Sequence, residues 1–142
     1  MNRRITSFYV ETLILILVFV AVILTLTKIF GMSKKLSDET KLLTSAVTLT
    51  QNAAEAFSVS ESDEKLFSLL DESGNASLEN GTVSASYRAD MSPDPDGVLC
   101  VIVERTVSEP AFSECVIRVI RSDTGAELYS VETAAIYTAA RR

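Results

Sequence analysis

The N-terminal part of the chain contains two hydrophobic segments, and the first is almost continuously apolar. Residues 8–30 read FYVETLILILVFVAVILTLTKIF, and residues 12–27 contain no charged side chain. A helix rises about 1.5 Å per residue, so this run can cross a hydrocarbon core of about 30 Å. A cleaved secretory signal is the rival interpretation, but its apolar core would be shorter, and Lys34 and Lys35 follow this run. We therefore expect a single transmembrane helix over residues 8–30.

The second stretch, residues 31–58, alternates apolar and polar positions with the period of a helix. Its apolar positions form two rows, Leu36, Leu43, Val47 and Ala54 in one and Leu42, Ala46, Leu49, Ala53 and Phe57 in the other. This pattern predicts an amphipathic helix that continues the transmembrane helix and packs its apolar stripe on a sheet. A coiled coil is the alternative, which we rank lower because the stripe has about three heptads and is rich in Ala and Thr.

The pattern changes again after residue 58, where residues 59–142 predict a separate α+β domain. Residues 60–71 indicate a short helix that Ser62 can cap, and the polar residues 73–81 indicate a loop. Four later segments have strand character and are joined by short turns: residues 82–89, 98–107, 112–121 and 127–139. We expect an α+β fold in which the long N-terminal helix packs on a four-stranded antiparallel meander.

Charge is segregated along the chain, and this limits the classes of function. Residues 1–36 hold five basic residues and one acid, net +4, whereas residues 37–142 hold eight basic and eighteen acidic residues, net −10. An acidic domain argues against nucleic acid as a partner. The chain has no His, which removes the usual general base and the commonest transition-metal ligand. We expect no catalytic residue, no metal site and no cofactor, and therefore no enzyme.

Basic residues flank the apolar run on both sides, so they orient it only weakly. Arg3 and Arg4 precede the run, and Lys28, Lys34 and Lys35 follow it. The strand-rich C-terminal part has few lysines and two cysteines, which favours a place outside the cytoplasm. We expect residues 1–7 to be a cytoplasmic basic leader and residues 59–142 to lie on the extracytoplasmic side of the cell membrane.

Cys100 and Cys115 fall on neighbouring predicted strands and are the candidate disulfide of the chain. If Val107 and Phe112 flank the connecting turn, Cys100 faces a residue near Ile120 and not Cys115. A bridge then needs a different register or turn. Two buried free thiols are the alternative.

Glu11 is the exceptional residue of the apolar run. An acid within a membrane segment is unfavourable and is a functional candidate by default, although it can also reach the headgroup level and stay hydrated. Near the middle of the chain Asp90, Asp94 and Asp96 also cluster. Their spacing lacks the pattern of a calcium loop, and Pro-Asp-Gly is common turn chemistry.

The N-terminus has a specific order of features: RRIT at residues 3–6, then SFYVETL at residues 7–13, then an apolar helix with an amphipathic extension. In this order the chain resembles type IV pilin-like proteins, which include the minor pseudopilins of type II secretion and related Gram-positive and Tad-type proteins. The resemblance implies that a prepilin peptidase cuts between Thr6 and Ser7. It also implies that Glu11 neutralises the N-terminal amine of a neighbouring subunit. Where the family usually has Gly before the cut, this chain has Thr6.

The function implied by this resemblance is structural. The chain would be a minor pilin or pseudopilin subunit of a type IV pilus or type II secretion-like filament, anchored in the membrane before assembly. Its partners would be other pilin-like subunits, an inner-membrane assembly platform, the prepilin peptidase and the lipid bilayer. The alternative is an uncleaved single-pass membrane adaptor or sensor with an extracytoplasmic binding domain, which needs neither the cut nor an acid in the helix.

Overall fold

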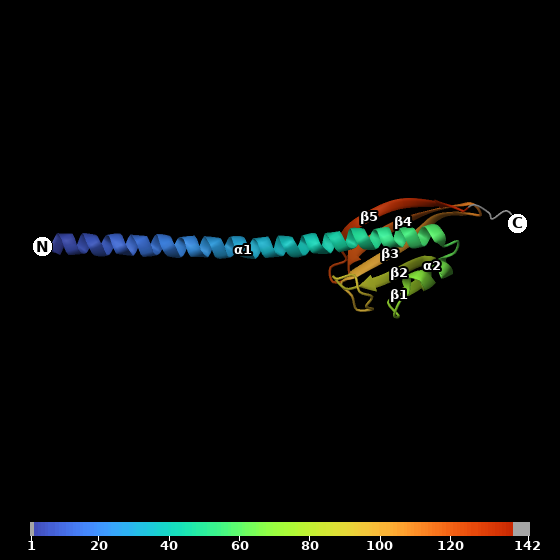
Figure 1. The fold of residues 1–142 in the computed structure, drawn as a ribbon, viewed down its shortest axis with the longest axis horizontal. Helices are drawn as coiled ribbons and strands as arrows, with labels where there is room; N and C mark the ends of the chain where they lie inside the picture. Colours follow the sequence, from blue (N-terminus) through green and yellow to red (C-terminus); the bar gives the residue numbers. More distant parts are fainter. Residues whose placement is uncertain (1, 138–142) are drawn as a thin grey trace. The chain divides into compact units, whose positions relative to one another are not determined.

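The computed structural model describes residues 2–137 and has an α+β fold (Figure 1). Two helices come first, α1 (Asn2–Val59) and α2 (Asp63–Leu70). Five strands follow: β1 (Ala76–Glu79), β2 (Thr82–Tyr87), β3 (Leu99–Glu109), β4 (Phe112–Arg121) and β5 (Glu127–Ile136). The chain divides into two compact units, one that ends at Thr40 and one that begins at Lys41. The fold class expected from the sequence is confirmed, with one more strand than expected.

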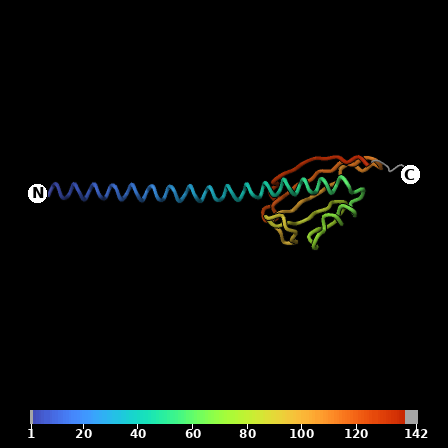
Figure 2. Tube along the Cα trace, viewed as in Figure 1, coloured from blue at the N-terminus to red at the C-terminus, as the bar shows by residue number. Residues whose placement is uncertain are grey.

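The apolar run and the amphipathic stretch belong to one uninterrupted helix, α1 (Figure 2). No Pro occurs between its ends, and Gly31 is its only Gly. The last turn closes at Ser60, whose backbone N–H and hydroxyl both donate to the carbonyl oxygen of Phe57, at 3.2 and 3.1 Å. The expected continuation of the apolar helix into the amphipathic one is therefore confirmed.

In the first unit, α1 exposes its apolar side chains. None of residues 2–40 is buried, and Leu17 and Phe30 are 68% and 72% exposed. By length and composition this part of α1 is a candidate membrane span. Exposure of these apolar side chains is favourable in lipid and unfavourable in water.

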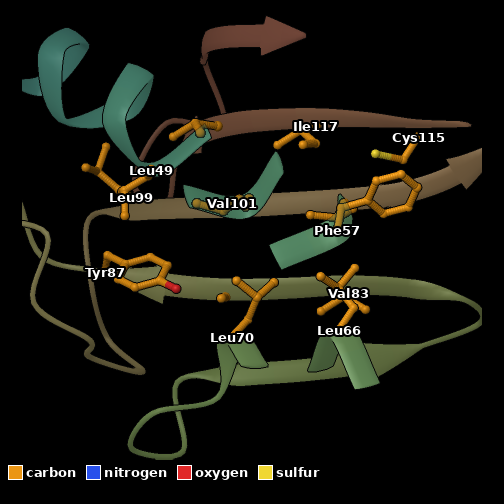
Figure 3. Packing of buried hydrophobic residues seen from close by; sticks show 14 of the residues in the cluster. Leu49, Phe57, Leu66, Leu70, Val83, Tyr87, Leu99, Val101, Cys115 and Ile117 are labelled. Atoms are coloured by element: carbon orange, nitrogen blue, oxygen red, sulfur yellow. The ribbon is translucent and has the colours of Figure 1, made fainter. Parts of the chain in front are cut away.

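In the second unit, one of the two apolar rows of α1 enters the hydrophobic core. Ala46, Leu49, Ala53 and Phe57 are buried and belong to one cluster with the sheet and with α2 (Figure 3). The same cluster takes in Leu99, Val101 and Ile117 from the sheet and Leu66 and Leu70 from α2. The other row is packed only in part: Ala54 packs against the cluster, whereas Leu36 and Leu43 are 65% and 45% exposed.

The sheet is an antiparallel meander in which each strand pairs with the next, in the order β1-β2-β3-β4-β5. Alternate side chains face the core, and these form the core face: Val83, Ala85, Leu99, Val101, Val103, Cys115, Ile117 and Val119. The others form the outer face, which includes Ser84, Ser86, Cys100, Ile102, Glu104, Val116, Arg118 and Ile120. The register places Cys100 opposite Ile120, as the sequence predicted.

The expectation of four strands was wrong because β1 lies within the segment expected to be a loop. Glu79 pairs with Thr82, which leaves Asn80 and Gly81 as a two-residue hairpin turn. Both turn residues have positive φ, 51° and 79°. Asn-Gly is the commonest sequence for such a turn. The polar residues of this segment therefore belong in part to a hairpin and not to a long loop.

The remaining expectations on local structure are confirmed with small shifts of boundary. Ser62 caps α2 and accepts a hydrogen bond from the backbone N–H of Lys65 at 3.3 Å. Strand β3 extends two residues beyond its expected end and contains an irregularity between Arg105 and Val107. The expected last strand reaches into residues 138–139, which lie outside the described residues.

Gly97 lies so close to neighbouring backbone that no larger residue fits there without a shift of the chain. It is buried, and a Cβ at this position would overlap the backbone of Tyr87. We expect Gly97→Ala to lower the free energy of unfolding of the sheet domain by about 2–3 kcal/mol, because the backbone must move. The readout is hydrogen exchange of the β2 and β3 amides. Gly31→Ala is the matched control, since nothing lies within 4 Å of its added Cβ. Equal exchange rates in the two variants would contradict the expectation.

Candidate functional site

In the apolar segment of α1, the threonine hydroxyls form hydrogen bonds with the backbone of their own helix. Three of its threonine hydroxyls donate to the carbonyl oxygen four residues earlier, at 2.8–2.9 Å: Thr12, Thr25 and Thr27. In a bilayer an unpaired hydroxyl would be unfavourable, and this pairing removes that penalty. The threonines are therefore compatible with a membrane span.

Glu11 has no such internal partner. Its side chain is exposed on α1, one turn after Phe8, and within residues 2–137 it takes part in no recorded hydrogen bond or ion pair. A carboxylate in a membrane segment needs water, a headgroup or an opposite charge. The structure records no ion pair between Glu11 and the other described residues, so an opposite charge from another molecule would be a suitable partner.

Thr6 and Ser7, the expected cleavage positions, also lie on α1. Both are exposed, and the Thr6 hydroxyl donates to the carbonyl oxygen of Asn2 at 2.7 Å. Cleavage between them would remove the first helical turns and leave Ser7 four residues before Glu11. The new amine at Ser7 and the Glu11 carboxylate would then both lie near the N-terminal end of the helix.

The two cysteines lie on opposite faces of the sheet. Cys115 is buried on the core face opposite Arg105, whereas Cys100 is half-buried on the outer face opposite Ile120. Both are free thiols. The structure therefore lacks the candidate disulfide, because side chains on opposite faces of one sheet point away from each other.

The thiols differ from ordinary cysteines in acidity, and this gives a test. Burial raises the pKa of Cys115 to about 12 and also raises the pKa of Cys100. Because the thiolate is the reactive form, we expect native Cys115 to resist iodoacetamide at pH 8. Two alkyl groups should be added per chain after denaturation without reductant. If the intact mass shows no added alkyl group after denaturation, the two cysteines are joined by a disulfide.

A cluster around Arg105 joins the end of α1, the start of α2 and three parts of the sheet. The Arg105 side chain is 7% exposed and faces the core. Its Nε donates to Asp63 Oδ1 at 2.8 Å, and one terminal nitrogen donates to the Ser113 hydroxyl at 2.7 Å. Its guanidinium carbon lies 4.6 Å from the centre of the Phe57 ring. We call this group the arginine cluster.

Tyr137 completes the arginine cluster at the C-terminal end of α1. Its hydroxyl lies within 2.6 Å of the Ser60 carbonyl oxygen and within 3.3 Å of that of Phe57, and 3.5 Å from Arg105. Burial opposes the charge of Arg105, but the hydrogen bonds with Asp63 and Tyr137 raise the pKa of its guanidinium above its usual value. The Tyr137 hydroxyl thus links Arg105 to the carbonyl groups at the end of α1.

The alternation of side chains along β3 contains a signal for this cluster. Arg105 follows Leu99, Val101 and Val103 at alternate positions, so it belongs to the buried row of that strand. A charged residue in a buried row requires a partner nearby. Asp63 supplies it from a segment forty-two residues earlier, which the strand pattern alone could not identify.

The aspartate cluster between β2 and β3 serves the turn. The Asp90 carboxylate accepts from the Ser92 N–H at 3.0 Å, and that of Asp94 accepts from the Asp96 N–H at 2.9 Å. Asp94 also pairs with Arg88, whose hydrogen bond holds the pKa of this carboxyl below its usual value. Over the described part of the chain, no group of His, Cys, Asp and Glu side chains is arranged to hold a metal ion.

Comparisons with protein-family models, with curated proteins and with solved structures gave no match to this chain. The case for a function therefore rests on three features of the chain itself. These are the exposed apolar segment of α1 with Glu11, the buried row of α1, and the sheet on which this row packs.

Proposed function

We propose that this chain is a structural subunit of a type IV pilin-like filament, a minor pilin or pseudopilin that the membrane holds before assembly. The continuity of α1 is the observation that carries the proposal. One helix joins an exposed apolar segment to a row of side chains buried in the core of a strand-rich domain. Such a helix can move from the bilayer into a bundle of similar helices while its C-terminal part stays packed on the sheet of its own domain.

The lone acid supports the same proposal. Glu11 is exposed in the apolar segment and forms no recorded ion pair within residues 2–137. In a bundle of apolar helices, an N-terminal amine from a neighbouring subunit would be its complement. This pairing would fix the axial register between subunits, because every other register leaves two charges unpaired in an apolar surrounding.

The proposed topology places residues 1–7 in the cytoplasm and the sheet domain outside it. The proposed partners follow from this arrangement: other pilin-like subunits along α1, an inner-membrane assembly platform, and a prepilin peptidase at the cytoplasmic face. The acidic sheet domain, with eighteen acids against eight basic residues over residues 37–142, would face the aqueous side.

A second candidate function, an uncleaved membrane adaptor or sensor, is favoured by one observation. Thr6 stands where a pilin-like leader usually ends in Gly. In this case α1 would be a permanent anchor, and Glu11 would lie at the headgroup level.

Fractionation of the cells that make this protein tests the proposal. Surface filaments are sheared off, collected by centrifugation and probed with an antibody against the sheet domain. We expect the chain in the filament fraction, and we expect it to remain in the membrane fraction in cells that lack the prepilin peptidase. If the chain occurs only in the membrane fraction in both cell types, it is an anchored protein and the filament proposal fails.

A further inference from the structure

The two edges of the sheet differ. At one edge β1 has four residues and lies beside α2 as well as β2. At the other edge β5 has ten residues and pairs with β4 as its one neighbouring strand among the described residues, while its core-facing side chains pack in the cluster that α1 also enters (Figure 1). Short strands and covering helices are the usual protection of an edge, and the β1 edge has both, whereas β5 is a long strand.

Among the usual protections of an edge, the sequence of β5 carries only the charges of Glu127 and Glu132. It contains no Pro and no Lys, and its one irregularity in register falls near Leu128, at the start of the strand. From Tyr129 to Ile136 the pairing with β4 is regular. In an antiparallel sheet, a regular edge strand presents unpaired N–H and C=O groups at alternate residues, which can pair with one more strand.

The side chains of β5 indicate what such a strand must carry. Val131 and Ala135 lie on the core face, opposite Ile117 and Ser113, whereas Glu132 and Ala134 lie on the outer face, opposite Val116 and Glu114. A further strand would therefore need small or apolar side chains toward the core face. On the outer face it would meet Glu132, with Glu114 and Arg118 on the neighbouring strand β4.

A hollow of about 310 Å³ lies on this surface, beside the edge. Glu114 and Glu132 both line it, and they are diagonal neighbours across the β4–β5 pair. Neither takes part in a recorded ion pair within the described residues. Two like charges at this spacing repel each other, so a cation between them is favourable.

We propose that the β5 edge binds an extended segment of a partner protein, which adds to the sheet as a sixth strand and places a Lys or Arg side chain between Glu114 and Glu132. Backbone pairing would supply the affinity, and the acidic hollow would supply the preference for a basic segment. The inference is independent of the filament proposal, because the edge is equally available in an uncleaved anchored protein.

Charge favours a basic partner over a second copy of this chain. Antiparallel pairing of β5 with β5 would bring two copies of Glu114 and Glu132 to one interface, with no basic residue on β5 to offset them. Each copy would also carry the net charge of −10 of residues 37–142. A basic strand neutralises the same groups that a second copy would crowd together.

The test uses the full chain in detergent micelles and two labelled ten-residue peptides. Both peptides alternate Val with polar residues, and they differ only in carrying two lysines or two glutamates. Fluorescence polarisation should show binding of the lysine peptide and about tenfold weaker binding of the glutamate peptide. Hydrogen exchange should slow in β5 upon binding and remain unchanged in β1. Protection of β1 instead, or the lack of binding of both peptides at millimolar concentration, overturns the proposal.

Charge reversal supplies the matched control. Glu114→Lys with Glu132→Lys should weaken binding of the lysine peptide about tenfold and improve binding of the glutamate peptide. Glu79→Lys makes the same kind of change on β1, at the other edge, and should alter neither. If Glu79→Lys has the effect of the double variant, the preference reflects net charge and the site is wrong. A β5–β5 dimer that excludes both peptides would also overturn the proposal.

Discussion

Arg105→Met is expected to lower the free energy of unfolding of the sheet domain by about 3 kcal/mol. The substitution removes a buried charge that binds Asp63 and Ser113 and leaves both without their partner. Breaking a buried pair on one side costs about 3–5 kcal/mol. Asp63 is 25% exposed and can recover some hydration, which places the expected loss at the lower end of this range. The measurement is hydrogen exchange of the slowest amides of β3 and β4.

Arg118→Met is the matched control, because it changes the same residue type in the same sheet. Arg118 lies on the outer face, 42% exposed, and reaches Glu104 at 3.4 Å. Exposed pairs contribute about 0–1 kcal/mol, so this variant should be close to the parent. Equal losses in the two variants would show that the arginine cluster has no special role. Asp63→Leu added to Arg105→Met should recover part of the loss, since no charge is then left unpaired.

Glu11→Ala is expected to reduce incorporation into filaments about tenfold or more, while membrane insertion stays intact. In the proposed bundle the substitution leaves a neighbouring amine without its counter-charge in an apolar surrounding. A penalty of about 1.4 kcal/mol per subunit contact already corresponds to tenfold. Insertion should not suffer, because an acid is lost from an apolar segment. The measurement is the ratio of filament to membrane protein in sheared cells.

The control for Glu11 moves the acid by one position. Val10→Glu combined with Glu11→Val keeps the composition of α1 and turns the carboxylate by about 100° around the helix. We expect incorporation of this double variant to fall as far as that of Glu11→Ala. Normal incorporation of either variant would mean that Glu11 has no role in assembly, and it would favour the anchored adaptor.

Much of the fold could be predicted because its signals are local. Helical spacing predicted two apolar rows on α1, one of which, with Ala46, Leu49, Ala53 and Phe57, is buried, and Ser62 marked the start of α2. The alternation of apolar residues identified four of the five strands. The fifth was missed at Asn80, where a turn sequence was interpreted as part of a loop, although its positive φ belongs to a hairpin.

The arginine cluster and the second apolar row depend on information that is not local. Arg105 finds Asp63 only when α2 is folded against the sheet, and no spacing in the sequence encodes that distance. Helical spacing likewise places Leu36 and Leu43 on the apolar stripe that was expected to pack on the sheet, yet both are exposed. The partner of Glu11 belongs to another molecule in the proposed filament, so neither the sequence nor the structure of one chain contains it.

The most direct test of the filament proposal is the intact mass and N-terminal residue of the protein from its native membrane. We expect a mature chain that begins at Ser7, with the mass of residues 1–6 removed. This result would provide the amine that Glu11 is proposed to neutralise. A chain that begins at Met1 would contradict the account, because α1 would then keep its basic leader and act as a permanent anchor.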